Sequence, residues 1–377
     1  MNRKLVHSAM ACAALLVASA SLSPAAPIDP SATCGECHKD IHRMWSASAH
    51  ARAMDDEIFL EAYRETKSGE GEEVSRQCLA CHAPLTAVNA DWGLAQKITW
   101  EGVHCDVCHG MVSVDMAGPN PRPVLDIGKV KRGPSKEAGS SAHEVAYSEL
   151  HTTALACAPC HEGSTADGVK VMTTYSEYLA SGAAKEGKTC QTCHMGKTRA
   201  NVVDPKIARE AAAEVNLHEV PGGHSLEQLH KALQVALDPK RNGDSLLVTV
   251  RLTNKGAGHA VPTGMPGRRV ILDLAVRSGT GAAFEGKRIY TKTFTDTQGT
   301  TITRDSKYFT KGLKLEADTR IQADERRTET FSFPLPAAAT AHVTLKLHYE
   351  HAPTGGPENR TWLTFYSENR TLPPGGR

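Results

Sequence analysis

The sequence is poor in aromatic side chains and has no excess of charge of either sign. Phe, Tyr and Trp make up 5% of the 377 residues, which is little material for a core built from side chains alone. Lys and Arg number 43 against 42 Asp and Glu, so the chain lacks the basic excess that general nucleic-acid binding requires. These shortages argue against a nucleic-acid-binding protein. They also indicate that something besides apolar side chains fills part of the interior.

Long apolar runs are also missing after the N-terminal segment, which argues against a membrane bundle. Residues 1–26 are typical of a secretory signal peptide, because Arg3 and Lys4 precede an apolar stretch over residues 9–20. Cleavage is expected near residue 20 or 26, and Cys12 is expected to leave with the peptide. A short membrane anchor is the less favoured alternative. We predict an exported protein, periplasmic or at the cell surface, with no transmembrane segment after cleavage.

The other ten cysteines all belong to one pattern, CxxCH, which occurs five times. This pattern attaches haem c: two thiols bind the porphyrin covalently, and the histidine that follows binds the iron on its proximal side. The cysteines are Cys34, Cys37, Cys78, Cys81, Cys105, Cys108, Cys157, Cys160, Cys190 and Cys193, and the proximal histidines are His38, His82, His109, His161 and His194. Zinc sites and disulfides also use paired cysteines, but neither explains the histidine after each second cysteine. We predict five covalently bound haem c groups.

Other histidines are candidates for the second, distal ligand of each iron. A histidine is more often an ordinary surface or core residue, but five irons need partners and imidazole is a common axial ligand. The candidates are His50, His104, His143, His151, His218, His224 and His259. Of these, His259 lies in the Gly258–Gly264 segment at the entrance of the later strands. We hypothesise that this loop folds back and supplies a distal imidazole to the haem segment.

The pattern changes after the last motif. Five motifs within residues 34–194 predict short helices and loops around closely spaced haems, followed by a helix from Asp204 to about Val215 and another capped by Ser225. From about residue 245 the sequence favours five to seven antiparallel strands without cysteine. We predict a two-domain α+β protein. A mainly α and irregular cytochrome domain occupies residues 27–240, and an antiparallel β-sandwich occupies residues 241–377.

Three segments resemble the multihaem c-type cytochromes of the cytochrome c554 family. They are Cys34–His38 followed by Trp45 and His50, residues 102–110, and Cys190–Met195 followed by residues 218–224. The Gly258–Gly264 stretch and the strands after it are similar to a C-terminal β domain found on some multihaem cytochromes. The resemblance covers residues 31–235 well and the remainder loosely. It implies electron transfer along a chain of mostly bis-histidine haems.

We therefore expect an electron-transfer protein rather than an enzyme, because two imidazole ligands leave no open position on an iron. Removal of Arg3 and Lys4 changes the formal net charge from +1 to −1, and haem propionates add negative charge. Redox protein partners are thus expected to present a basic face. Two alternatives remain open. One is a multihaem oxidoreductase that acts on a nitrogen or sulfur compound at one five-coordinate haem. The other is a self-associating subunit of a haem filament.

Overall fold

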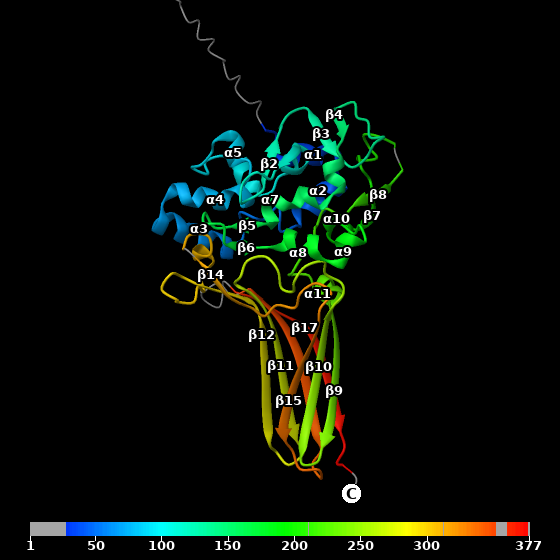
Figure 1. Ribbon diagram of the computed structural model, residues 1–377. Helices are drawn as coiled ribbons and strands as arrows, with labels where there is room; N and C mark the ends of the chain where they lie inside the picture. The colour runs from blue at the N-terminus through cyan, green and yellow to red at the C-terminus, as the bar shows by residue number, and fades with distance from the viewer. Residues whose placement is uncertain (1–27, 210, 312, 352–359, 376–377) are drawn as a thin grey trace, which may run out of the picture.

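The chain combines short helices with many antiparallel sheets in a mixed α+β arrangement (Figure 1). The structure is a computed structural model that describes residues 28–209, 211–311, 313–351 and 360–375. The predicted signal segment and Cys12 lie outside the described residues. No helix in the described ranges is long and apolar enough to cross a membrane.

Residues 28–232, called the motif region below, hold nearly all of the helical structure. Its α-helices are α1 (Ser31–Cys37), α2 (Lys39–Ser46), α3 (Glu57–Glu70), α4 (Glu72–His82), α5 (Thr86–Asn89), α6 (Cys105–His109), α7 (Ala158–His161), α8 (Thr174–Ala180), α9 (Gly182–Lys185), α10 (Cys190–His194) and α11 (Leu226–Ala232). Its 3-10 helices are η1 (Lys97–Glu101), η2 (Glu149–Thr152) and η3 (Ala154–Cys157). Short strand pairs connect them: β1 (Met111–Asp115) with β2 (Arg122–Leu125), β3 (Val130–Gly133) with β4 (Glu144–Tyr147), β5 (Gly163–Ser164) with β6 (Lys170–Met172), and β7 (Lys197–Ala200) with β8 (Ala213–Asn216).

Residues 233–375, the strand region, form two larger sheets. A three-stranded sheet has the order β15-β10-β9, and a four-stranded sheet has the order β12-β11-β16-β17. The strands are β9 (Leu233–Asn242), β10 (Ser245–Asn254), β11 (Arg268–Ser278), β12 (Ala283–Tyr290), β15 (Arg326–Pro334), β16 (Ala341–His351) and β17 (Thr361–Leu372). A separate pair, β13 (Lys292–Thr295) and β14 (Lys314–Asp318), flanks η4 (Asp305–Lys307) and lies toward the motif region in Figure 1.

The apolar core is distributed very unevenly between the two regions. One cluster of 25 buried residues is built mainly from both large sheets of the strand region. Along β11 the side chains of Val270, Leu272, Leu274 and Val276 alternate into it, as the period of a strand requires. The largest cluster confined to the motif region has six members, around α3 and α4. The motif region therefore depends on something other than apolar side chains for its interior.

Several local expectations need correction. β9 begins at Leu233, so strand structure starts eight residues before the boundary expected at residue 241. The helix expected from Asp204 to about Val215 is not present in the described part of that range (204–209 and 211–215). The carboxylate of Asp204 binds Lys39, its amide donates to the carbonyl of Cys37, and residues 213–216 pair with β7. The helix after Ser225 is confirmed: its hydroxyl accepts from the amide of Gln228 at 3.4 Å.

Ion pairs and hydrogen bonds join the motif region to the strand region. Glu65 on α3 pairs with Arg304 and accepts from the hydroxyl of Ser306 at 2.7 Å. Glu70 at the end of the same helix pairs with Lys307 at 3.1 Å and with Lys311 at 2.6 Å. Burial of these charges is incomplete, so each pair contributes little alone, but together they fix α3 against the loop around η4.

Candidate haem sites

Each CxxCH motif lies at or next to a short helix. In α4, α6, α7 and α10 the motif histidine is the last helical residue, and in α1 it follows directly after Cys37. Residues three apart share one face of a helix, so the two thiols of a motif point to the same side. The histidine then stands at the point where the helix ends and its ring is free to turn. The helices thus place two thiols and one imidazole toward a common space.

Backbone carbonyls orient most of the motif histidines. The Nδ1 atom of the ring donates to a carbonyl in each case: His38 to Val202 at 2.6 Å, His82 to Ala53 at 3.2 Å, His109 to Arg132 at 2.7 Å and His194 to Pro221 at 2.6 Å. A carbonyl only accepts, so the proton resides on Nδ1 and the lone pair of Nε2 stays available. This is the arrangement expected of a metal-binding imidazole with its supporting hydrogen bond.

Burial favours the neutral form of three motif imidazoles. It lowers the pKa of His82 and of His109 to about 4, and the pKa of His161 to about 3. His161 nevertheless has an exposed surface. A ring that is surrounded by protein and still accessible borders an internal space, which fits a bound porphyrin. Neutral imidazole is also the form that coordinates a metal.

Thiols of different motifs approach one another. The thiols of Cys34 and Cys105, of Cys81 and Cys160, and of Cys157 and Cys190 lie close enough to interact. The first motif is therefore beside the third, the second beside the fourth, and the fourth beside the fifth. Cys108 of the third motif is also near the fourth, because its charge contributes to the raised pKa of both Cys157 and Cys160. All ten thiols are free of disulfides.

Four motif histidines have a second imidazole at one characteristic distance. A bond of about 2 Å holds a ring centroid about 3 Å from the metal, so two imidazoles on opposite sides of one iron lie about 6 Å apart. The observed centroid distances are 6.1 Å for His38–His143, 6.3 Å for His161–His50, 6.1 Å for His109–His151, 6.4 Å for His109–His218 and 6.2 Å for His194–His259. The structure thus brings five of the seven candidates to motif histidines.

His109 has two neighbours, and their hydrogen bonds differ. His218 donates from Nδ1 to the carbonyl of Asn216 at 2.7 Å, which leaves Nε2 free as in the motif histidines. His151 instead uses Nε2, which donates to the carbonyl of Cys108 at 2.7 Å. The hydrogen-bond pattern therefore favours His218 as the imidazole opposite His109.

The remaining two candidates are not in ring contact with a motif histidine. His104 is buried, its Nδ1 accepts from the amide of Asp106, and its ring packs edge-on to Trp45 at 6.3 Å. His224 lies against Tyr349, with ring centroids 5.9 Å apart. In the described residues, His82 is the motif histidine that has no second imidazole near its ring; Phe59 stacks on it at 3.6 Å instead.

A glycine helps to position His50. The amide of Val103 donates to the carbonyl of His50 at 2.9 Å, and the indole of Trp45 donates to the carbonyl of Val103 at 3.0 Å. Gly102 has a φ of +64°, and a Cβ there would collide with the same carbonyl of His50. The close approach requires glycine, and the bond from Val103 ties the backbone of His50 to the segment just before the third motif.

The His259 loop is attached to the motif region through Glu177 on α8. One oxygen of Glu177 accepts from the amide of Ala260 at 3.0 Å and from the hydroxyl of Thr263 at 2.9 Å. The other pairs with Arg320 at 2.8 Å. His259 donates from Nδ1 to the carbonyl of Ala260, so its Nε2 is free toward His194. The carboxylate therefore sets the position of an imidazole supplied by the strand region.

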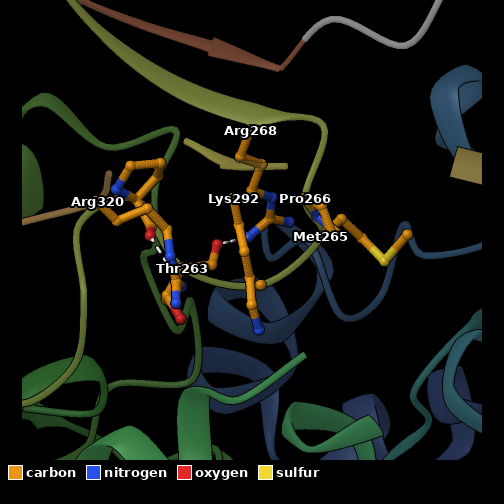
Figure 2. Close-up of a pocket in the computed structure, with 8 residues that line it drawn as sticks. Thr263, Met265, Pro266, Arg268, Lys292 and Arg320 are labelled. Carbon is orange, nitrogen blue, oxygen red and sulfur yellow. Dashed lines mark hydrogen bonds between the residues drawn. The ribbon is translucent and has the colours of Figure 1, made fainter. Parts of the chain in front are cut away.

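Buried cations at this junction were not identified from the sequence. Lys292 is 5% exposed, donates to the carbonyls of Lys170 and Val171 at 3.2 Å, and has its pKa lowered to about 8 by burial. Figure 2 shows its side chain beside Arg268 and Arg320 around the 262–268 turn. Lysine and arginine are usually exposed, so residue type does not indicate this burial. The available signal is strand alternation, which places Lys292 on the same face as Phe294 and Arg268 on the same face as Val270.

Comparisons with known proteins agree with this geometry. A family model described as cytochrome c554 and c-prime matches residues 33–110. Cytochrome c-554 of Nitrosomonas europaea is 26% identical over 165 residues, which cover 41% of this chain and 67% of the relative. The chain is a multihaem c-type cytochrome. A penta-heme cytochrome c552 from Thermochromatium tepidum shares its fold, with a TM-score of 0.73 and 22% identity over 91% of this chain and 99% of the other.

The cytochrome thus carries covalently bound haem c and transfers electrons. Its residues suit that group in three ways: paired thiols on helix faces, imidazoles with a free Nε2, and ring pairs at the spacing of two axial ligands. It acts with redox partners.

Proposed function

We propose that the cytochrome carries electrons along five covalent haems, one at each CxxCH motif. The observation that carries the proposal is the spacing of 6.1–6.4 Å between four of the motif histidines and a second imidazole. Each haem would be held by the two cysteines of its motif. Its iron would be bound by His38 with His143, His161 with His50, His109 with His218, and His194 with His259. The haem supplies one-electron chemistry at its iron.

Two imidazoles on one iron favour electron transfer over catalysis, because they fill both axial positions. The fold of the polypeptide sets which motifs are neighbours in space. Thiol contacts support a row of motifs one, three, four and five, with the second motif beside the fourth. Neighbouring sites in this row are those expected to exchange electrons fastest.

The strand region is proposed to be a β-sandwich domain that follows a pentahaem domain. The two large sheets share one apolar core, which supports a sandwich. Its His259 loop would complete one iron site and lock the two domains together. The N-terminal sequence supports export, and attachment of haem c outside the cytoplasm would place the protein in the periplasm or at the cell surface.

Haem counting tests the proposal. The mass of the mature protein should exceed that of the bare polypeptide by five haem units. The double variant C157A/C160A should lose one unit and keep four, because only the fourth motif is removed. As a control, His342→Ala changes an exposed residue outside every motif and should keep all five. A wild-type mass with four or fewer haems would contradict the proposal.

Oxidation-state counting provides an independent test. Full reduction of the oxidised protein should consume five electron equivalents, with low-spin signals from the four bis-histidine irons. A protein in which most haems are high-spin would instead support a catalytic role.

A further inference from the structure

Three of the four imidazoles that lie opposite motif histidines are fixed by distant segments. The loop of His259 donates two hydrogen bonds to Glu177. The carbonyl of His50 accepts from the amide of Val103 at 2.9 Å. His218 follows β8, and every residue of that strand pairs with β7. Each of these imidazoles can therefore move only if a tertiary contact breaks.

The fourth imidazole, that of His143, ends an exposed loop. Residues 134–142 are all exposed, and with His143 they are called the His143 loop below. The hydroxyl of Ser140 accepts from the amide of His143 at 3.4 Å, and no hydrogen bond of residues 134–142 reaches another described segment. The side chain of Lys136 lies 5.1 Å over the ring of Tyr147, just beyond the loop. The loop thus buries no apolar side chain and holds His143 mainly through its own turn.

The ring of His143 nevertheless has the geometry of an iron ligand. Its Nδ1 donates to the carbonyl of Glu144 at 3.1 Å, so Nε2 is free, and its centroid lies 6.1 Å from that of His38. The bond to Glu144 selects the tautomer and orients the ring. It links adjacent residues, however, and does not hold the loop over the first motif.

Both ends of the His143 loop are fixed by one strand pair. β3 and β4 pair in parallel along their whole length, directly before and after the loop. β3 also supplies the carbonyl of Arg132, which accepts from His109 at 2.7 Å. Segments with exposed backbone and few buried contacts open at a low free energy. The loop can therefore lift while its ends and the third motif stay in place.

We infer that the His143 loop is a detachable strap, which lets the first iron release His143 while the other irons keep their distal imidazoles. In the release, the bond between Nε2 and the iron breaks, the imidazole keeps its lone pair, and no electron is transferred. The inference rests on the proposed haem at Cys34–His38. It goes beyond electron transfer, because one end of the motif row gains an iron that can change its axial ligand. Axial ligation sets the potential of a haem, so release changes one potential without a change in the rest of the fold.

Reaction with diethyl pyrocarbonate tests the strap in the oxidised, haem-loaded full chain. The reagent acylates a free imidazole nitrogen, so a coordinated Nε2 is protected until its bond to the iron opens. Peptide mass spectrometry should show that His143 reacts about tenfold or more faster than His218 and His259, because its loop opens more easily. The exposed His342 gives the rate of an unprotected ring, and the ratio of the two rates measures the open fraction. Acylated His143 cannot bind again, so the low-spin signal should fall by about a quarter.

Two serine variants form a matched pair. Ser140→Ala removes the hydroxyl that accepts from the His143 amide, and it should speed the acylation of His143 several-fold. Ser135 lies in the same exposed loop, and its hydroxyl has no hydrogen-bond partner among the described residues. Ser135→Ala should leave the rate unchanged.

Two results would overturn the strap. One is a His143 that is protected as strongly as His218 and His259, and the other is an unchanged acylation rate in Ser140→Ala. A Cys34–His38 peptide that lacks haem by mass would contradict the proposed function instead. So would acylation of His143 with no loss of low-spin signal, because His143 would then not be the partner of His38.

Discussion

Substitution of His259 by alanine is the sharpest test of the link between the strand region and the haems. The change removes one imidazole that lies 6.2 Å from the ring of His194. It leaves the loop attached, because the bonds from Ala260 and Thr263 to Glu177 do not involve the His259 ring. We expect the fold to persist while one iron loses its distal ligand.

The expected change in spin state follows from the number of imidazole ring pairs. Four motif histidines have a second imidazole, so the wild type should have four low-spin haems and one high-spin haem. His259→Ala should reduce the low-spin signal by about a quarter and roughly double the high-spin signal. Electron paramagnetic resonance measures both, and carbon monoxide binding to the reduced protein should rise from one site to two.

A matched control is available within the same region. His342 lies on β16, is exposed, and bonds only to the hydroxyl of Thr371 at 3.1 Å. His342→Ala should leave the spin count unchanged. If His259→Ala also leaves it unchanged, the loop supplies no ligand and the role of the strand region must be sought elsewhere.

Three further outcomes test the packing. Leu272→Ala should lower the unfolding free energy by about 2–5 kcal/mol in a denaturant titration, since Leu272 is fully buried between two sheets; a loss below about 1 kcal/mol would contradict the assigned core. Gly256→Ala should cost about 1–3 kcal/mol, because the new Cβ would collide with the carbonyl of Lys231, whereas Gly139→Ala, with open space around it, should be neutral. The pKa of Lys292 falls from 10.5 to about 8, so the unfolded chain binds its proton more tightly than the folded one; stability should rise by about 3 kcal/mol between pH 8 and 10.5. Lys292→Met should flatten that rise, and an equal slope in both proteins would refute the burial of the charge.

Local sequence was enough where the chemistry is local. A CxxCH motif contains both thiols and the proximal imidazole within five residues, so its identity needs no knowledge of the fold. The alternation of Val270, Leu272, Leu274 and Val276 likewise indicates a strand with one buried face, and the structure confirms β11. The Ser225 cap is local for the same reason.

Local patterns failed where a distant partner decides the outcome. Asp204 resembles a helix cap, but Lys39 and the carbonyl of Cys37 occupy it and prevent a helix. β9 contains Asp238, Pro239 and Lys240, which disfavour a strand by composition, and it forms because β10 pairs with its whole length.

The sequence could not predict which imidazoles pair, for a similar reason. His38 and His143 are separated by more than a hundred residues, and His194 meets His259 only because α8 and the loop after β10 converge on Glu177. The sequence by itself determined the cofactor, because covalent attachment is encoded over a few adjacent residues. The tertiary structure decided which second imidazole lies opposite each motif histidine, and that His82 has none near its ring. The reason is that ligand geometry depends on how distant segments pack.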